Sequence, residues 1–157
     1  MTRRVRLRDA ALHAAPGDAP EGFRVRRLRP GPGLGAVRTG ATLYEIPPGQ
    51  AVCPYHYEYG EEEWALVLEG RPSVRTPEGV RELEPLDLVF FPPGPEGAHQ
   101  VRNDGDQPAR VLMWSEIVHP SATAYPDSGK VGVWTGDRAE DVMVRRRDAV
   151  VVLDGEV

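Results

Sequence analysis

Short apolar runs separated by turn residues fill most of the chain. Residues 36–46 and 109–118 are the longest of these runs, and 51–59, 63–70 and 87–91 lie between them. The 17 glycines and 16 prolines are spread between valine-rich and aromatic-rich segments, where they end short strands rather than long helices. Strands at this spacing predict an all-β protein built as a sandwich or a barrel.

Further elements are shorter or less regular. Strands are also expected at 23–28, 71–76, 80–84, 98–103 and 131–134. We expect a loop at residues 119–130, a terminal strand pair within 142–157 and a short helix at 8–14.

The length of 157 residues suits one domain that buries most of its apolar surface without disulfides. We divide the chain into an amino-terminal arm with the first strand (1–34), a barrel (35–118) and a carboxy-terminal extension (119–157). The extension has no signature of an independent domain, so we expect it to pack on the barrel or on a partner subunit.

The formal net charge of -5 is unevenly distributed. Residues 1–30 contain eight arginines and three acidic residues, so this segment carries +5 and the remainder carries −10. A basic arm is one feature of nucleic-acid-binding proteins, but no helix-turn-helix, zinc-finger or RNA-binding signature accompanies it. We therefore predict no nucleic-acid partner, and an arm that is solvated or lies on an acidic neighbouring subunit.

Cysteine use and hydropathy predict a cytoplasmic location. Cys53 is the only cysteine, so it cannot form an intrachain disulfide, which fits a reducing compartment. The opening MTRRVRLRDAALHAAPGD lacks the apolar core of a signal peptide. No apolar run approaches the length of a transmembrane helix, so no membrane association is expected.

The segment PYHYEYGEEEWALVLEG, residues 54–70, carries the clearest chemistry. On a strand, residues two apart share a face, so His56 and Glu58 should project together. Glu63 begins the next strand, and His99 lies on a later strand from which it could join them across a barrel. Two imidazoles and two carboxylates predict a divalent metal site, since imidazole suits Zn, Cu, Fe or Ni and carboxylate favours harder ions such as Mn.

Other readings of these residues remain open. The histidines and glutamates could form a metal-free hydrogen-bonded cluster around a small ligand or water, in which one buried carboxyl would keep its proton. Glu58 is a candidate metal ligand, but also a candidate general base or a hydrogen-bond acceptor for substrate. Cys53 is separated from His56 by an odd number of positions, so we expect it to face away from the metal.

The spacing of these residues resembles the first motif of the cupin superfamily, G-x5-H-x-H-x3,4-E-x6-G. Gly49, His56, Glu63 and Gly70 fit this motif with one extra residue before the histidine. Glu58 stands where the second histidine of the motif belongs.

Residues 86–103 resemble the second cupin motif, roughly G-x5-P-x-G-x2-H-x3-N. His99 and Asn103 keep their separation, and the Pro-x-Gly element is present as PEG at 95–97, lengthened and shifted by one. Leu86 replaces the glycine of the Pro-Gly-Asp turn common in this family. Leucine is far less suited than glycine to a positive φ, so the type of this turn is left open.

The resemblance implies a double-stranded β-helix, the cupin or jelly-roll barrel, and often a homodimer. It implies His56, Glu63 and His99 as ligands of a divalent metal ion, with Glu58 at the fourth ligand position, and the ion as Mn, Fe, Ni or Zn. The flanking segments LYEIPPGQ and YPDSGK are similar to a branch of small single-barrel cupins, some of which are described as sugar-phosphate isomerases by analogy.

Two functions follow as expectations. The first is a metal-dependent isomerase, lyase or oxygenase acting on a small polar or sugar-like molecule, with Glu58 as ligand or catalytic acid/base. The alternative is a non-catalytic small-molecule-binding cupin with a degraded metal site, which the exchange of histidine for Glu58 favours.

Overall fold

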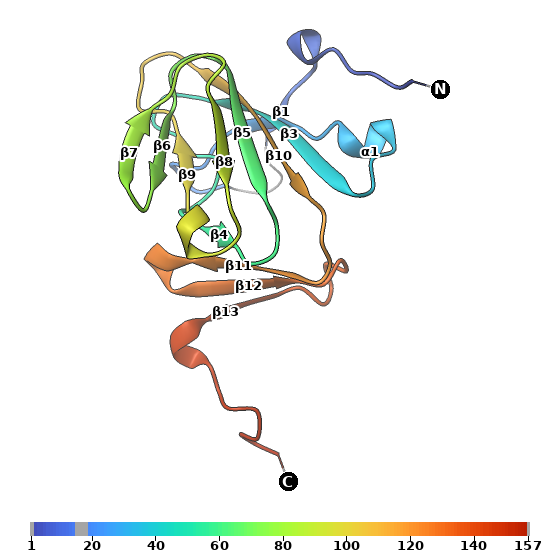
Figure 1. Ribbon diagram of the computed structural model, residues 1–157, viewed down its shortest axis with the longest axis vertical. Helices are drawn as coiled ribbons and strands as arrows, with labels where there is room; N and C mark the ends of the chain where they lie inside the picture. Colours follow the sequence, from blue (N-terminus) through green and yellow to red (C-terminus); the bar gives the residue numbers. More distant parts are fainter. Residues whose placement is uncertain (1, 15–18, 157) are drawn as a thin grey trace.

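A six-stranded antiparallel sheet forms one wall of the barrel in the computed structural model, which describes residues 2–14 and 19–156 (Figure 1). Its order is β1 (His13–Ala14), β2 (Arg26–Leu28), β3 (Thr39–Ile46), β10 (Ala109–Glu116), β5 (Glu63–Glu69) and β8 (Leu88–Phe91). The two longest strands, β3 and β10, pair along their whole length.

A three-stranded sheet forms the opposite wall. Its order is β7 (Gly79–Glu82), β6 (Ser73–Thr76) and β9 (Gln100–Arg102). Buried apolar side chains from both walls make one core cluster, to which β5 gives Val67, β10 gives Val111, β6 gives Val74 and β9 gives Val101. The predicted double-stranded β-helix is therefore confirmed.

Alternation along β10 shows how the sequence specifies the wall. Val111 and Met113 are buried in the core cluster, whereas Leu112 and Trp114 are only partly buried because they lie on the outer face. Both faces of the strand are apolar, which is typical where a further layer covers a sheet.

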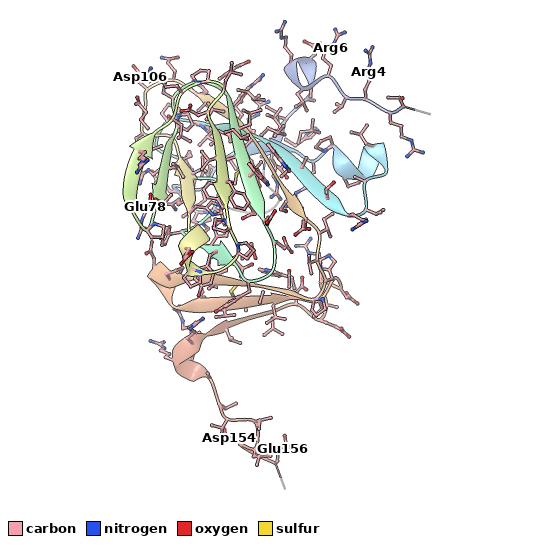
Figure 2. The ribbon with its side chains drawn as sticks, viewed as in Figure 1. Arg4, Arg6, Glu78, Asp106, Asp154 and Glu156 are labelled. Atoms are coloured by element: carbon pink, nitrogen blue, oxygen red, sulfur yellow. The ribbon has the colours of Figure 1, made fainter. Side chains whose placement is uncertain are left out.

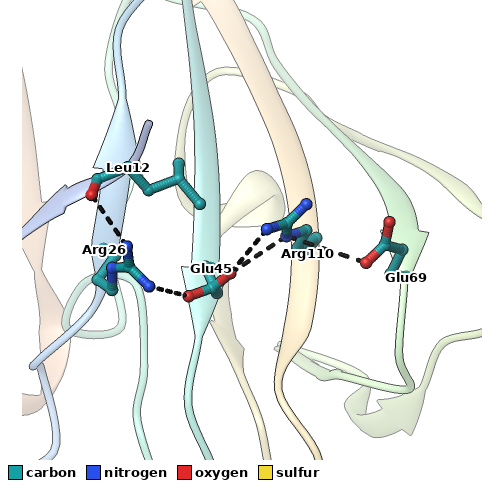
Figure 3. Close-up of polar contacts among 5 residues, drawn as sticks. All are labelled: Leu12, Arg26, Glu45, Glu69 and Arg110. Carbon is teal, nitrogen blue, oxygen red and sulfur yellow. Dashed lines mark hydrogen bonds and ion pairs between the residues drawn. The ribbon is translucent and has the colours of Figure 1, made fainter. Parts of the chain in front are cut away.

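A row of charged side chains crosses the outer face of this wall at one end (Figure 3). Arg26 donates to Glu45 at 2.9 Å and to the Leu12 carbonyl at 3.2 Å, so it ties the segment before β1 to β3. Arg110 on β10 donates to the other Glu45 oxygen at 3.0 Å and lies 3.9 Å from a carboxylate oxygen of Glu69. These side-chain contacts connect the four neighbouring strands β2, β3, β10 and β5 across the sheet.

The carboxy-terminal extension adds a third sheet beneath the barrel (Figure 1). Its order is β13 (Val142–Arg145), β12 (Lys130–Trp134), β11 (Ser121–Tyr125) and β4 (Tyr57–Glu58). Arg75 on β6 donates to both oxygens of Asp127, at 2.6 and 2.9 Å, and so fastens the extension to the barrel. Since β4 follows His56 directly, this sheet lies next to the predicted metal site.

The two ends of the described chain lie apart. Arg4 and Arg6 are on the amino-terminal segment at one end of the molecule, and Asp154 and Glu156 are on the carboxy-terminal segment at the other (Figure 2). The short helices are α1 (Gly31–Leu34) and 3-10 turns at Leu7–Asp9, Pro95–Gly97, Pro126–Ser128 and Arg146–Asp148. Among the described residues, no helix has the length and apolarity to cross a bilayer.

Three local expectations are wrong. Residues 8–14 form no α-helix, because His13 and Ala14 pair with Arg27 and Arg26 of β2. The expected loop at 119–130 contains strand β11, which pairs on both sides, so tertiary pairing outweighs its flanking prolines. The expected terminal strand pair is the single strand β13, which ends where the turn Arg146–Asp148 begins.

Candidate metal centre

His56 and His99 face each other across an antiparallel bridge between two segments distant in sequence. The His56 N–H donates to the His99 carbonyl at 3.0 Å, and the His99 N–H donates to the His56 carbonyl at 2.8 Å. Directly paired residues of this kind project their side chains to the same face. The two imidazole rings consequently lie side by side, with centroids 4.6 Å apart.

Backbone carbonyls select one tautomer of each neutral imidazole. Nδ1 of His56 lies 2.9 Å from the Pro54 carbonyl, and Nδ1 of His99 lies 2.9 Å from the Gly97 carbonyl. A carbonyl oxygen only accepts, so each Nδ1 carries the proton and each Nε2 keeps a free lone pair. Histidines that bind metals are usually oriented in this way by a partner on the other ring nitrogen.

Glu63 brings a carboxylate to the two imidazoles from the start of β5. Its Oε2 lies 3.7 Å from Nε2 of His56 and 3.5 Å from Nε2 of His99. At these separations the contacts are electrostatic rather than hydrogen bonds. One ligand atom from each of the three residues lies within 4.8 Å of the other two, so three of the four predicted residues converge.

Two atoms of this cluster are buried without a hydrogen-bond partner in the described structure, namely Oε2 of Glu63 and Nε2 of His99. Leaving a buried polar atom unsatisfied costs about 1–3 kcal/mol. A divalent cation would satisfy both atoms at once, and two imidazole nitrogens with one carboxylate are a common ligand set for catalytic zinc and non-haem iron. The residues present therefore fit a divalent metal ion.

Protonation of the metal-free cluster follows from burial and the enclosed charges. Burial lowers the pKa of His56, but the neighbouring side chains of Cys53 and Glu63 outweigh it and raise that pKa to about 11. Burial, reinforced by the charge on His56, lowers the pKa of His99 to about 4. Burial raises the pKa of Glu63, but the two histidines more than offset it and leave that pKa lowered. At neutral pH the metal-free cluster therefore holds one proton beyond those on the two Nδ1 atoms, and this proton is on Nε2 of His56.

Glu58 lies beside the cluster but is held by a different partner. Thr123 on β11 donates its hydroxyl to Oε2 of Glu58 at 2.6 Å, and Nε1 of Trp134 donates to that hydroxyl at 2.6 Å. Burial raises the pKa of Glu58 to about 7, although the Thr123 hydrogen bond opposes the shift. Its role as fourth ligand or as acid/base stays a prediction.

A cavity of about 400 Å³ leads to the cluster. His56 and Glu63 lie in its wall together with Tyr44 from β3, Met113 from β10 and Arg29 from the segment before α1. Its volume is within the range typical of small-molecule sites. The predicted ligand-binding interior is thus open to a small molecule at the face that carries the cluster.

The expectation that Cys53 faces away from the centre is wrong. Cys53 lines the same cavity as His56 and contributes to the raised pKa of that imidazole. Residues 52–55 form bends rather than a strand, so side chains there do not alternate between faces. Tyr125, which stacks on His56 with centroids 6.0 Å apart, was also not expected at the site. The alternation in SATAY, residues 121–125, was the available signal for it.

The fold and the site define a class: a double-stranded β-helix with two histidines and a glutamate beside a cavity of small-molecule size. Residues 42–115 match the Cupin domain family, so the chain contains a cupin domain, as the motif resemblance predicted. Among curated proteins, none matches the sequence.

Three solved structures resemble the chain over most of its length. One from Acidithiobacillus ferrooxidans, which carries the provisional name of a sugar phosphate isomerase, is 26% identical, has a TM-score of 0.76 and is matched over 83% of this chain and 82% of its own. A sugar phosphate isomerase of the cupin superfamily from Silicibacter pomeroyi is 22% identical with a TM-score of 0.80, over 97% of this chain and 98% of its own, which supports the fold. The polyketide cyclase RemF from Streptomyces resistomycificus is 26% identical with a TM-score of 0.59, over 74% and 80%.

Proposed function

We propose that this protein is a metal-dependent enzyme that acts on a small polar or sugar-like molecule in the barrel cavity, by isomerase, lyase or oxygenase chemistry. The observation that carries the proposal is the pair of buried, unpartnered atoms, Oε2 of Glu63 and Nε2 of His99, which converge with Nε2 of His56. The name of the Acidithiobacillus ferrooxidans protein supports a sugar-like substrate.

In this proposal His56, Glu63 and His99 hold the ion. A divalent ion bound there supplies Lewis acidity toward a substrate oxygen. Glu63 as the only carboxylate ligand leaves a net charge of +1 on the centre, whereas an ionised Glu58 close by would neutralise it and weaken that acidity. Glu58 has a pKa near 7 and a fixed hydrogen bond to Thr123, so it is suited to accept and return a proton at neutral pH.

Elemental analysis tests the proposal on protein purified without a metal-affinity tag, before and after incubation with Mn, Fe, Ni or Zn. We expect near-stoichiometric metal in the wild type, loss in His56→Ala and in Glu63→Ala, and retention in Cys53→Ser. Glu58→Ala separates its two roles, because a ligand loses metal affinity and an acid/base loses only turnover. A wild type that takes up none of the four metals overturns the enzyme proposal.

The alternative is a non-catalytic cupin that binds a small molecule without metal. It is favoured by one specific observation, since the residue at the second histidine position, Glu58, already has a protein partner in Thr123. Ligands that raise the melting temperature of metal-free protein, and that still do so in His99→Ala, would support this alternative.

We also propose a homodimer in which a second copy covers the outer face of β5, β8 and β10. Trp64 stacks on Trp114 and packs against Phe90 on this face, and its rim leaves Leu88 55% and Phe90 41% exposed. A contiguous exposed apolar face is one feature of protein interfaces. We further propose that the dimer resides in the cytoplasm and binds no nucleic acid.

Sedimentation equilibrium tests the dimer. Phe90→Arg places a charge at the exposed rim of the face, on the edge strand β8, and should shift the wild-type dimer toward monomer. Val80→Arg is the control, because Val80 is an exposed apolar side chain on β7, in the three-stranded sheet of the opposite wall. A wild type that is monomeric at all accessible concentrations contradicts the dimer.

A further inference from the structure

Few charged side chains line the cavity, and they belong to two different groups. Glu63 and His56 belong to the candidate metal centre, and among the described residues of the wall Arg29 is the one arginine, with no lysine beside it. Arg29 is exposed, and within residues 2–14 and 19–156 it forms no ion pair, whereas nearby Arg26 is paired with Glu45. A guanidinium at a cavity wall is thus left free to bind an anion.

The backbone around Arg29 is well placed to hold it there. Arg29 directly follows β2 and precedes Pro30, whose ring fixes one backbone dihedral. The Pro30 carbonyl then accepts the Leu34 N–H at 3.1 Å in the turn that contains α1. The backbone of Arg29 is therefore ordered between a strand and a closed turn, which lowers the entropy lost when its side chain binds a ligand.

Tyr44 lies near Arg29 in the cavity wall. Tyr44 lines the same wall, and burial raises the pKa of its phenol while the nearby charges of Arg29 and Arg27 oppose the shift, with Arg29 the larger of the two. Arg27 does not line the cavity. Arg29 thus lies on the cavity side of this arginine pair.

From this placement we propose that the ligand of the cavity carries a carboxylate or phosphate group, which binds the Arg29 guanidinium while its uncharged oxygens face the metal centre. The part that concerns the metal end rests on the proposed function. Arginine suits such groups because its planar fork donates two parallel hydrogen bonds to a carboxylate or phosphate. Arg29 would be a specificity-determining residue that selects anionic over neutral substrates.

Calorimetric titration with three matched probes tests the proposal: glycerol 3-phosphate, glycerate and glycerol. They share a hydroxylated carbon chain and differ in whether they carry a phosphate, a carboxylate or no charge. The wild type, loaded with whichever metal it binds, should bind at least one anion about tenfold or more tighter than glycerol. The tighter of the two anions then identifies the group that Arg29 prefers.

Arg29→Ala should reduce the affinity for that anion by about tenfold or more and leave glycerol affinity and metal content unchanged. Arg27→Ala is the matched control and should change the anion affinity less than about twofold. Equal binding of all three probes, no measurable binding of either anion, or an equal loss in Arg27→Ala overturns the assignment.

The two proposals fail in distinguishable ways. If the wild type takes up no metal, the same titrations on metal-free protein still test Arg29, and a selective loss in Arg29→Ala sustains the anion site alone. If metal binds but Arg29→Ala behaves as the wild type, the anion site is wrong and the metal centre stands.

Discussion

Uptake of a divalent ion by the centre should release about one proton at neutral pH. His56 is the source, because Cys53 and Glu63 beside it raise its pKa well above 7 despite burial, whereas the lowered pKa of His99 leaves that ring neutral. Metal and proton compete for the Nε2 lone pair of His56. Each pH unit below the pKa of His56 therefore weakens metal binding about tenfold, or about 1.4 kcal/mol.

Calorimetry with Ni²⁺ in three buffers of different ionisation enthalpy measures this release directly. The slope of the observed enthalpy against the buffer enthalpy gives the number of protons, and we expect about one between roughly pH 7.5 and pH 9. If Glu58 is a ligand, its own proton adds to the count below about pH 7, where its raised pKa keeps it partly protonated. In Glu58→Gln that extra fraction should disappear.

The outcome that refutes this reasoning is Ni²⁺ binding with an enthalpy independent of buffer and an affinity independent of pH. It would mean that His56 is already neutral, so that Glu63 does not hold its proton. Cys53→Ser controls for the other neighbour, and it should still release close to one proton because Glu63 remains in place.

Three further predictions concern stability. Burial raises the pKa of Glu58 from 4.5 to about 7, so this group favours the folded state at low pH and loses that contribution as pH rises through 7. In urea denaturation, Glu58→Gln should therefore stabilise the fold by about 1–3 kcal/mol at pH 8 and change its stability little at pH 4. Leu86 adopts a φ of 76° and is 79% exposed, so Leu86→Gly should gain up to about 1 kcal/mol by the same assay, and a loss would show that the leucine is covered in solution. A Cβ at Gly97 would overlap the Pro92 carbonyl, so Gly97→Ala should lower the free energy of unfolding by about 1–3 kcal/mol. It should also weaken metal binding, because the Gly97 carbonyl orients the His99 imidazole. Gly33→Ala is the control and should be nearly neutral, because a Cβ there meets open space.

Much of the barrel and all three converging residues could be predicted because each depends on a local signal. Period-two alternation sets the faces of β10, and the cupin spacing gives His56, Glu63 and His99. Cys53 and Tyr125 escaped prediction for a physical reason. Bends at residues 52–55 abolish the alternation on which the orientation of Cys53 was argued, and Tyr125 reaches His56 only because β11 pairs with β4.

At Leu86 the backbone conformation of the Pro-Gly-Asp turn is retained although leucine replaces the glycine. The segment Glu84–Asp87 closes with a hydrogen bond from the Asp87 N–H to the Glu84 carbonyl at 3.0 Å, and Leu86 takes the positive φ that glycine would adopt. The Leu86 N–H also donates to the Val67 carbonyl at 2.8 Å, which anchors the turn to β5. Pairing to the neighbouring strand therefore outweighs a conformational cost of about 1–2 kcal/mol.

Glu58, which replaces the second histidine of the motif, has a hydrogen-bond partner from outside the matched domain. Thr123 lies on β11 and Trp134 on β12, both beyond residues 42–115, and together they supply the hydrogen bond that Glu58 accepts. Without Thr123, the same burial would press the carboxyl more strongly toward its neutral form, because that hydrogen bond is the largest effect that lowers its pKa. The extension thus influences the protonation of a group beside the candidate metal site, so the barrel motif alone does not determine the chemistry there.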